Sequence, residues 1–171
     1  QVEKLLQDDD IEFVRDDSFG EINVYRKIRE GTITFSAPSN ILHDCGTSAT
    51  ATKEIKALFN EKIFDNAKPV SLVKKCISLV ENNKSDIMLD FFAGSGTTAH
   101  AVMNLNLEDG GRRKYILVEM GEHFNSIILP RIKKIAFSDQ WREGKALPEG
   151  VGISHFVKYY SLEQYEDALR R

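Results

Sequence analysis

The residues best suited to chemistry stand together at positions 89–98, in the sequence Leu-Asp-Phe-Phe-Ala-Gly-Ser-Gly-Thr-Thr. Hydrophobic residues precede the glycines and a helix-like stretch follows them, so we predict a strand, a tight turn and a helix. Glycine lets a ligand approach the main chain closely, and the first N–H groups of the helix are free hydrogen-bond donors. Glu119 ends the next predicted strand, where a carboxylate can accept hydrogen bonds from both ribose hydroxyls. The spacing therefore predicts a nucleotide site at the carboxyl ends of two neighbouring strands.

The kind of nucleotide depends on the residues around the glycines. A phosphate-binding loop needs a Lys followed by Ser or Thr, and Thr97-Thr98 does not supply it. Gly94, Gly96 and Ala99 meet the dinucleotide fingerprint in its loosest form, so a dinucleotide-dependent oxidoreductase stays an alternative. Asp90 argues against that alternative, because it would repel a pyrophosphate but could pair with an ammonium group.

Three separated motifs carry a resemblance to a known family. Residues 90–98 are similar to the cofactor motif of the amino-group DNA methyltransferases, usually Asp-Pro-Phe-x-Gly-Ser-Gly-Thr-Thr, with Phe91 in place of the proline. Residues 64–70, with their Lys-Pro pair, resemble the helix start that contacts the methionine part of S-adenosylmethionine in that family. Residues 155–169 resemble the C-terminal signature of type III modification subunits, and residues 46–54 resemble the segment that follows their target-recognition region. The chain thus resembles the C-terminal part of such a subunit, a DNA adenine methyltransferase whose catalytic motif precedes the cofactor motif.

The resemblance implies S-adenosylmethionine as the cofactor. It implies that the cofactor is surrounded by Lys68, Pro69, Asp90, Phe91, Phe92, Ala93, Gly94, Ser95, Gly96, Thr97, Thr98 and Glu119. Glu119 would bind the ribose, and Lys68 and Pro69 would lie near the carboxylate end. Without the resemblance, Lys68 is equally well explained as an exposed lysine at a helix start.

A catalytic segment is missing from the sequence. Methylation of an adenine amino group requires a pocket for the flipped base, which this family builds from Asp-Pro-Pro-Tyr. The four prolines of this chain are isolated, so that segment is absent. We expect no catalytic residue here, a catalytic half upstream of Gln1, and a chain that binds the methyl donor without transferring the methyl group alone. Methylation of the cytosine amino group, and a non-catalytic interaction module of the same fold, stay open as alternatives.

Periodic hydrophobic residues predict the elements that hold the site. Alternation over residues 11–36 predicts a small β-rich segment. Helical spacing predicts four helices and a short terminal one: from Thr52, from Lys68-Pro69, over 98–106, over 127–137 and over 162–169. Buried-strand patterns cover residues 86–92 and 115–119, and a last strand is predicted over 153–159. The alternation of strands and helices indicates a parallel sheet with crossover helices.

These elements predict an α/β fold, a partial Rossmann-like methyltransferase domain with a mostly parallel sheet and a β-rich N-terminal segment. We assign residues 1–47 to a remnant of the target-recognition region and residues 48–171 to the part that binds S-adenosylmethionine. Because the chain begins at Gln1 without an initiator Met, we expect it to be a piece of a longer protein.

Composition and isolated polar residues limit the other possibilities. The net charge of −3 does not indicate a nucleic-acid binder, so DNA contact is expected only through the complete enzyme. No apolar run is long enough to span a membrane, and the two cysteines form no motif, which favours the cytoplasm. His43 and Cys45 lack a second ligand pair, so no metal site is expected. His100 is interpreted as a surface or partly packed residue, and His123 has no obvious carboxylate partner. Besides DNA, we expect the upstream catalytic half and a restriction subunit as partners, and the sequence leaves a homodimer open.

Overall fold

A computed structural model describes residues 11–16, 21–27, 41–80, 83–163 and 165–170. The chain divides into two units, Gln1–Pro38 and Ser39–Arg171. The roles predicted for residues 1–47 and 48–171 stay predictions.

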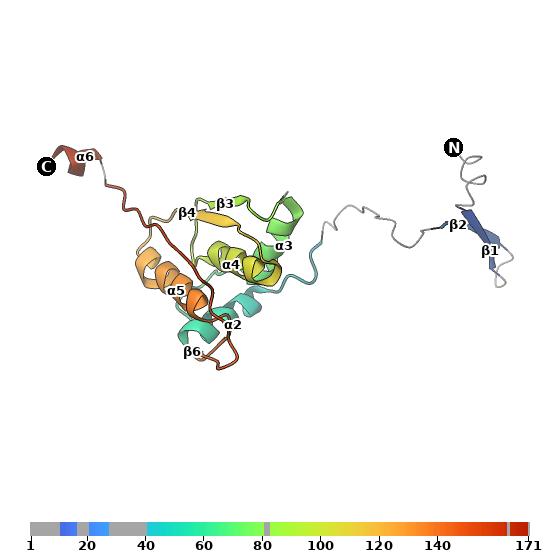
Figure 1. Ribbon diagram of the computed structural model, residues 1–171, viewed down its shortest axis with the longest axis horizontal. Helices are drawn as coiled ribbons and strands as arrows, with labels where there is room; N and C mark the ends of the chain where they lie inside the picture. Colours follow the sequence, from blue (N-terminus) through green and yellow to red (C-terminus); the bar gives the residue numbers. More distant parts are fainter. Residues whose placement is uncertain (1–10, 17–20, 28–40, 81–82, 164, 171) are drawn as a thin grey trace. The chain divides into compact units, whose positions relative to one another are not determined.

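The first unit contains a β-hairpin (Figure 1). Strands β1 (Ile11–Asp16) and β2 (Glu21–Arg26) pair antiparallel, with Ile11 opposite Arg26. This part of the predicted β-rich segment is confirmed. The strand-like residues Ile33 and Phe35 lie outside the described residues.

The second unit alternates helices and strands, in the order shown in Figure 1. Its elements are α2 (Ser48–Phe59), α3 (Val70–Val80), β3 (Ile87–Asp90), α4 (Thr97–Asp109), β4 (Lys114–Leu117), η1 (Phe124–Ile128), α5 (Leu129–Phe137), β5 (Trp141–Arg142), β6 (Lys145–Ala146) and α6 (Tyr165–Leu169). Helix α2 begins before the predicted Thr52, because the side chains of Thr47 and Thr50 cap each other's backbone N–H groups. The helix predicted over 127–137 begins earlier, with the π-helical turn η1.

The two central strands form the predicted parallel pair. Ile87 lies opposite Lys114 and Asp90 lies opposite Leu117, and α4 makes the crossover between the strands. The hydrogen bonding continues past the strand ends, since Val118 N donates to Asp90 O at 2.9 Å and Ala93 N donates to Val118 O at 3.1 Å. The residues after β3 and β4 are therefore held side by side at the carboxyl edge of the sheet.

The core of this unit lies between the sheet and the helices. Figure 1 shows β3 and β4 on one side of α4, with α2 on the other side. Side chains of α4 pack against those of α5, η1 and α2, and the residues of this cluster are Leu58, Ala93, Ala99, Met103, Ile128, Ile132 and Ile135. Apolar burial of this kind dominates the stability of a small domain.

The outer face of the sheet differs from the prediction of buried strands. Ile87, Leu89 and Ile116 are 57%, 52% and 51% exposed, whereas Met88 and Tyr115 face the helices and are partly buried. Because helices cover one face of this pair of strands, exposed and partly buried side chains alternate along each strand. The burial predicted for the outward-facing residues was wrong in this structure.

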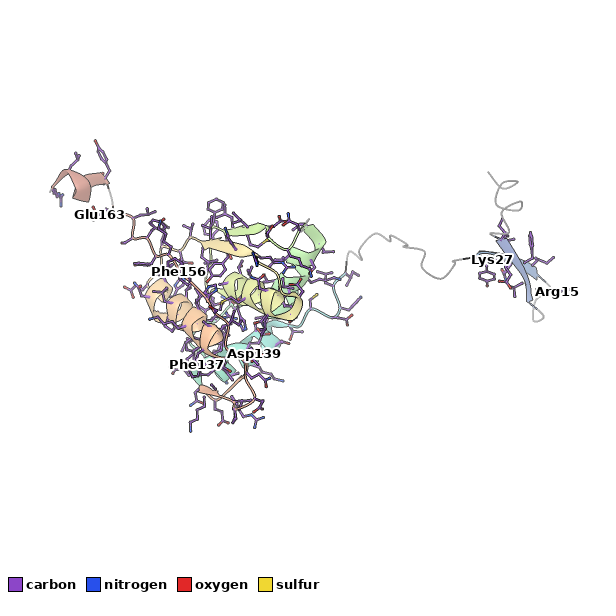
Figure 2. All side chains as sticks on the ribbon, in the orientation of Figure 1. Arg15, Lys27, Phe137, Asp139, Phe156 and Glu163 are labelled. Carbon is purple, nitrogen blue, oxygen red and sulfur yellow. The ribbon has the colours of Figure 1, made fainter. Side chains whose placement is uncertain are left out.

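The segment after β6 also differs from the prediction. The strand predicted over residues 153–159 does not form, and Ile153 N donates to Ala136 O of α5 at 2.8 Å. Phe156 on this segment is 87% exposed (Figure 2). The short helix α6 begins at Tyr165, later than predicted. Among the residues described, no helix has the length and apolar character needed to cross a membrane.

Candidate cofactor site

The turn between β3 and α4 depends on two glycines in the left-handed region. Gly94 has φ 55° and Gly96 has φ 76°, and Gly96 N donates to Ala93 O at 2.8 Å to close the turn. A Cβ on Gly94 would stand 3.4 Å from the Phe64 ring, and a Cβ on Gly96 would stand 3.4 Å from Ile128. These are ordinary van der Waals contacts, so both positions favour glycine through backbone conformation.

Asp90 lies at the end of β3, directly before this turn. Its Oδ2 accepts a hydrogen bond from Thr98 Oγ1 at 2.6 Å, and its Oδ1 accepts one from Phe92 N at 3.1 Å. The carboxylate thus connects the strand end to the first turn of α4. The neighbouring side chains of Phe91 and Phe92 are 63% and 88% exposed.

Glu119 follows β4 and reaches across to the same turn. Its Oε2 accepts from Gly94 N at 2.8 Å, and its Oε1 accepts from Met120 N and Gly121 N, each at 2.9 Å. His123 Nε2 lies 3.1 Å from the same Oε2. Burial acts to raise the pKa of Glu119, but the hydrogen bonds from Gly121, Gly94 and His123 outweigh it and lower the pKa. The carboxylate is therefore charged at neutral pH.

Lys68 and Pro69 lie beside the other end of the turn. Thr97 Oγ1 donates to Lys68 O at 3.3 Å, so the helix start at α3 and the turn are in direct contact. The Lys68 side chain is exposed, whereas Pro69 is buried. Val70 N, next in sequence, donates to the Glu54 carboxylate at 3.1 Å.

Two predicted site residues direct their side chains into the protein. Ser95 is 3% exposed and Thr97 is 6% exposed, and their hydroxyl oxygens lie 3.0 Å apart. Arg131 of α5 donates to both hydroxyls at 3.1 Å and also to Ser95 O at 3.1 Å. These two side chains are consequently structural parts of the turn, and a ligand on the solvent side would meet its main chain.

Three residues that the sequence analysis did not assign to the site lie at it. Phe64 packs on Gly94 and edge-on to His123, with ring centroids 5.5 Å apart. The expectation that His123 has no carboxylate partner was wrong, because it pairs with Glu119 four residues earlier. The third residue is Arg131. His100, which contacts Arg131, is 9% exposed and is therefore buried, unlike the surface residue that the sequence suggested. The spacing between Glu119 and His123 was a usable signal, whereas nothing in the local sequence marks Arg131.

The side chains at the turn suit one class of ligand. Asp90 and Glu119 are carboxylates at the ends of adjacent parallel strands, on either side of a turn without lysine. Carboxylates accept hydrogen bonds from hydroxyl and ammonium groups and repel phosphates. Over the described part of the chain, no group of three or more metal-ligating side chains is present. The arrangement fits a ribose and an amino group better than a pyrophosphate.

Comparison with known proteins identifies the class. Residues 20–130 match the DNA methylase family, and this is well over half of the chain. The chain therefore belongs to the DNA methylase family. DNA methylation is the chemistry of this family.

Individual relatives narrow the resemblance to restriction-modification systems. The chain is 51% identical over 79 residues to the type III restriction-modification enzyme StyLTI Mod subunit of Salmonella typhimurium, covering 46% of this chain and 12% of that protein. It is 38% identical over 124 residues to the EcoP15I Mod subunit of Escherichia coli, covering 71% and 18%. The type II methyltransferase M.KpnI of Klebsiella pneumoniae is 48% identical over 69 residues, covering 40% and 16%. The predicted resemblance to a type III modification subunit is confirmed, and the chain spans less than a fifth of the length of these relatives.

Proposed function

We propose that this chain is the methyl-donor-binding portion of a site-specific DNA adenine methyltransferase, in a partial Rossmann-like domain. The observation that carries the proposal is the pair of carboxylates, Asp90 and Glu119, that flank the Gly94–Gly96 turn at the ends of two parallel strands. Membership of the DNA methylase family supports it. The proposed cofactor is S-adenosylmethionine, which supplies an electrophilic methyl group when it is bound.

Each side of the turn has a separate role in this proposal. Glu119, held in place by four N–H groups, binds the ribose hydroxyls by exchanging part of these donors for the ligand. Asp90 attracts the ammonium group, and the segment at Lys68 and Pro69 lies toward the carboxylate end of the donor. Exposed Phe91 and Phe92 flank the ligand with apolar surface.

Methyl transfer requires a second part that the sequence of this chain lacks. Without Asp-Pro-Pro-Tyr there is no pocket for a flipped adenine, so we infer that the chain alone binds the donor but leaves DNA unmethylated. For the complete enzyme, which we place in the cytoplasm, we propose three partners: the upstream catalytic half, DNA and a restriction subunit. A homodimer of this enzyme would contain two copies of the full-length modification subunit. Methylation of adenine in duplex DNA by this chain alone would contradict the inference of inactivity.

Calorimetric titration tests the proposed cofactor. The chain is titrated with S-adenosylmethionine, S-adenosylhomocysteine and NAD. We expect binding of the first two and no binding of NAD, because a pyrophosphate would approach Asp90. Preference for NAD would favour the oxidoreductase alternative, and binding of none by the folded chain would favour an interaction module.

Variants of the two carboxylates locate the binding in the same experiment. Asp90→Ala and Glu119→Ala should each weaken binding by about tenfold or more, since each removes a charged hydrogen-bond acceptor. Glu108→Ala is the matched control, because this carboxylate pairs with Lys74 on the surface, away from the turn. Equal affinity in the wild type and both site variants would show that the donor binds elsewhere.

A further inference from the structure

Arg131 on α5 is the most deeply buried charged side chain in the described residues, with 1% exposure. Its Nη1 donates to Ser95 O, Ser95 Oγ and Thr97 Oγ1, each at 3.1 Å. Its Nη2 lies 3.1 Å from His100 Nδ1. Burial and the positive charges of Arg131 and Lys74 hold the pKa of His100 well below its ordinary value, so a neutral His100 accepts this bond.

The charge of Arg131 has no adjacent carboxylate in the described part of the chain. Its nearby acidic group, Glu54, attracts it without ion-pair contact, and burial lowers the pKa of Arg131 to about 10. The guanidinium is still charged at neutral pH. A buried cation is costly unless it is paired, and an apolar side chain of similar size is often more stabilising at such a position. Stability alone is therefore a poor explanation for this arginine. Its four hydrogen-bond acceptors lie in the turn and in the first four residues of α4, on Ser95, Thr97 and His100.

We propose that Arg131 is a positioning residue of the donor site, which fixes the turn against the start of α3. This inference rests on the proposed function. Thr97 Oγ1 accepts from Arg131 and donates to Lys68 O, so one hydroxyl joins α5, the turn and the helix start. Arg131 thus sets the spacing between two segments that are far apart in sequence and flank one end of the proposed ligand.

Arg131 and Glu119 act on opposite ends of the turn. Arg131 contacts Ser95 and Thr97, whereas Glu119 contacts Gly94. Displacement of Ser95 and Thr97 would chiefly affect the ligand end that faces Lys68, which is the amino-acid end in this account. A ligand without that end, such as 5′-methylthioadenosine, should be much less sensitive to Arg131 than S-adenosylhomocysteine is.

Calorimetry with these two ligands tests the inference, with the thermal midpoint of unfolding measured alongside. Arg131→Met removes the charge and keeps the length of the stem. We expect it to weaken S-adenosylhomocysteine by about tenfold or more and 5′-methylthioadenosine by less than about threefold. Arg131→Lys should restore the affinity in part, since an ammonium keeps the charge but not the forked geometry.

Arg113→Met is the matched control for the loss of a buried arginine. Arg113 is 7% exposed and its Nη2 donates to Asp109 Oδ2 at 2.8 Å, at the other end of α4. It should lower the midpoint of unfolding and leave both affinities unchanged. The inference is overturned if Arg131→Met binds S-adenosylhomocysteine as the wild type does, or loses both ligands equally.

A second variant keeps the test valid if Arg131→Met does not fold. Thr97→Val keeps the shape of the side chain and removes the hydroxyl between Arg131 and Lys68 O. It should show the same selective loss of S-adenosylhomocysteine, and unchanged affinity would overturn the inference. A wild-type chain that binds neither ligand would instead overturn the proposed function, and with it the role of Arg131.

Discussion

Glu119 of the proposed site is held in one orientation by the chain itself. Both carboxylate oxygens accept N–H groups of the chain itself, from Gly94, Met120 and Gly121, at 2.8–2.9 Å. These bonds keep the carboxylate charged and in one orientation, so little ordering is left to the binding step. In the proposed site, ribose hydroxyls would share or replace donors that are already in place.

The lowered pKa of Glu119 leads to a prediction about pH. Because the folded protein binds this proton more weakly than the unfolded chain does, the stability from Glu119 is present above the ordinary value of 4.5 and is lost as the pH falls below it. Glu119→Gln should therefore flatten the fall of the thermal midpoint between about pH 5 and pH 3, and should weaken S-adenosylhomocysteine by about tenfold. Thermal unfolding as a function of pH, with calorimetry at pH 7, measures both effects.

Asp109 provides the control for this experiment. A hydrogen bond from Arg113, helped by Gly111 N and Lys84, holds the pKa of Asp109 well below its ordinary value. Asp109→Asn should also flatten the acid limb, by the same sign argument, but should leave the ligand affinity unchanged because Asp109 ends α4. A Glu119→Gln variant with the wild-type acid limb and affinity would contradict the role given to Glu119.

At the scale of single residues, the sequence predicted the features that depend on residues close together in the chain. The turn at 93–96 and the carboxylates at Asp90 and Glu119 follow from neighbouring residue types, and the structure places both carboxylates at that turn. Arg131 comes to the turn through the packing of α5, which no short pattern encodes, so its role could be recognised only from the contacts. Phe64 begins the motif at residues 64–70, but its position against Gly94 was visible only in the structure.

At the scale of elements, α4 begins and ends with a glycine in the left-handed region. Gly96 caps its start with φ 76°, and Gly110 caps its end with φ 67°. A Cβ on Gly96 would be in ordinary van der Waals contact with Ile128 at 3.4 Å, whereas a Cβ on Gly110 would have nothing within 4 Å. Both substitutions therefore strain the backbone, but Gly96 lies at the turn and Gly110 lies at the other end of α4.

Alanine at each glycine should affect stability and binding differently. A left-handed residue other than glycine costs about 1–2 kcal/mol, so Gly96→Ala and Gly110→Ala should each lower the thermal midpoint by roughly 2–8 °C. Gly96→Ala should also weaken S-adenosylhomocysteine, because relief of the strain moves the N–H groups at the start of α4. Thermal unfolding and calorimetry on the two variants check this, and equal affinities would show that the geometry of the turn is not needed for binding.

Helices could be predicted because the spacing of hydrophobic residues marks the side of a helix that packs. Strands were harder to predict because a strand also depends on a neighbouring strand. The helical spacing in α3 and α5 corresponds to faces that are buried in the structure, whereas α4 is buried at consecutive residues from Ala99 to Met103. A strand needs a partner for its hydrogen bonds, and the hydrophobic residues at 153–159 could not show whether one is present. Ile153 N bonds to α5 instead, and no strand forms there.

At the scale of the whole molecule, the outer face of the sheet is the main departure from an ordinary domain. Ile87, Leu89 and Ile116 are each more than half exposed on it. Their apolar character led to the prediction of buried strands, since parallel strands are usually covered on both faces. The chain spans 12–18% of the lengths of the Mod subunits it matches.

Photochemical cross-linking of the methyl donor tests most directly whether the site lies at the turn. The chain is irradiated with labelled S-adenosylmethionine, with and without excess S-adenosylhomocysteine, and the labelled tryptic peptides are identified by mass spectrometry. We predict a label that is lost on competition, in peptide 85–112, which holds the turn, or in peptide 115–131, which holds Glu119. A competed label in peptide 146–158, or no competed label in the folded chain, would contradict the account.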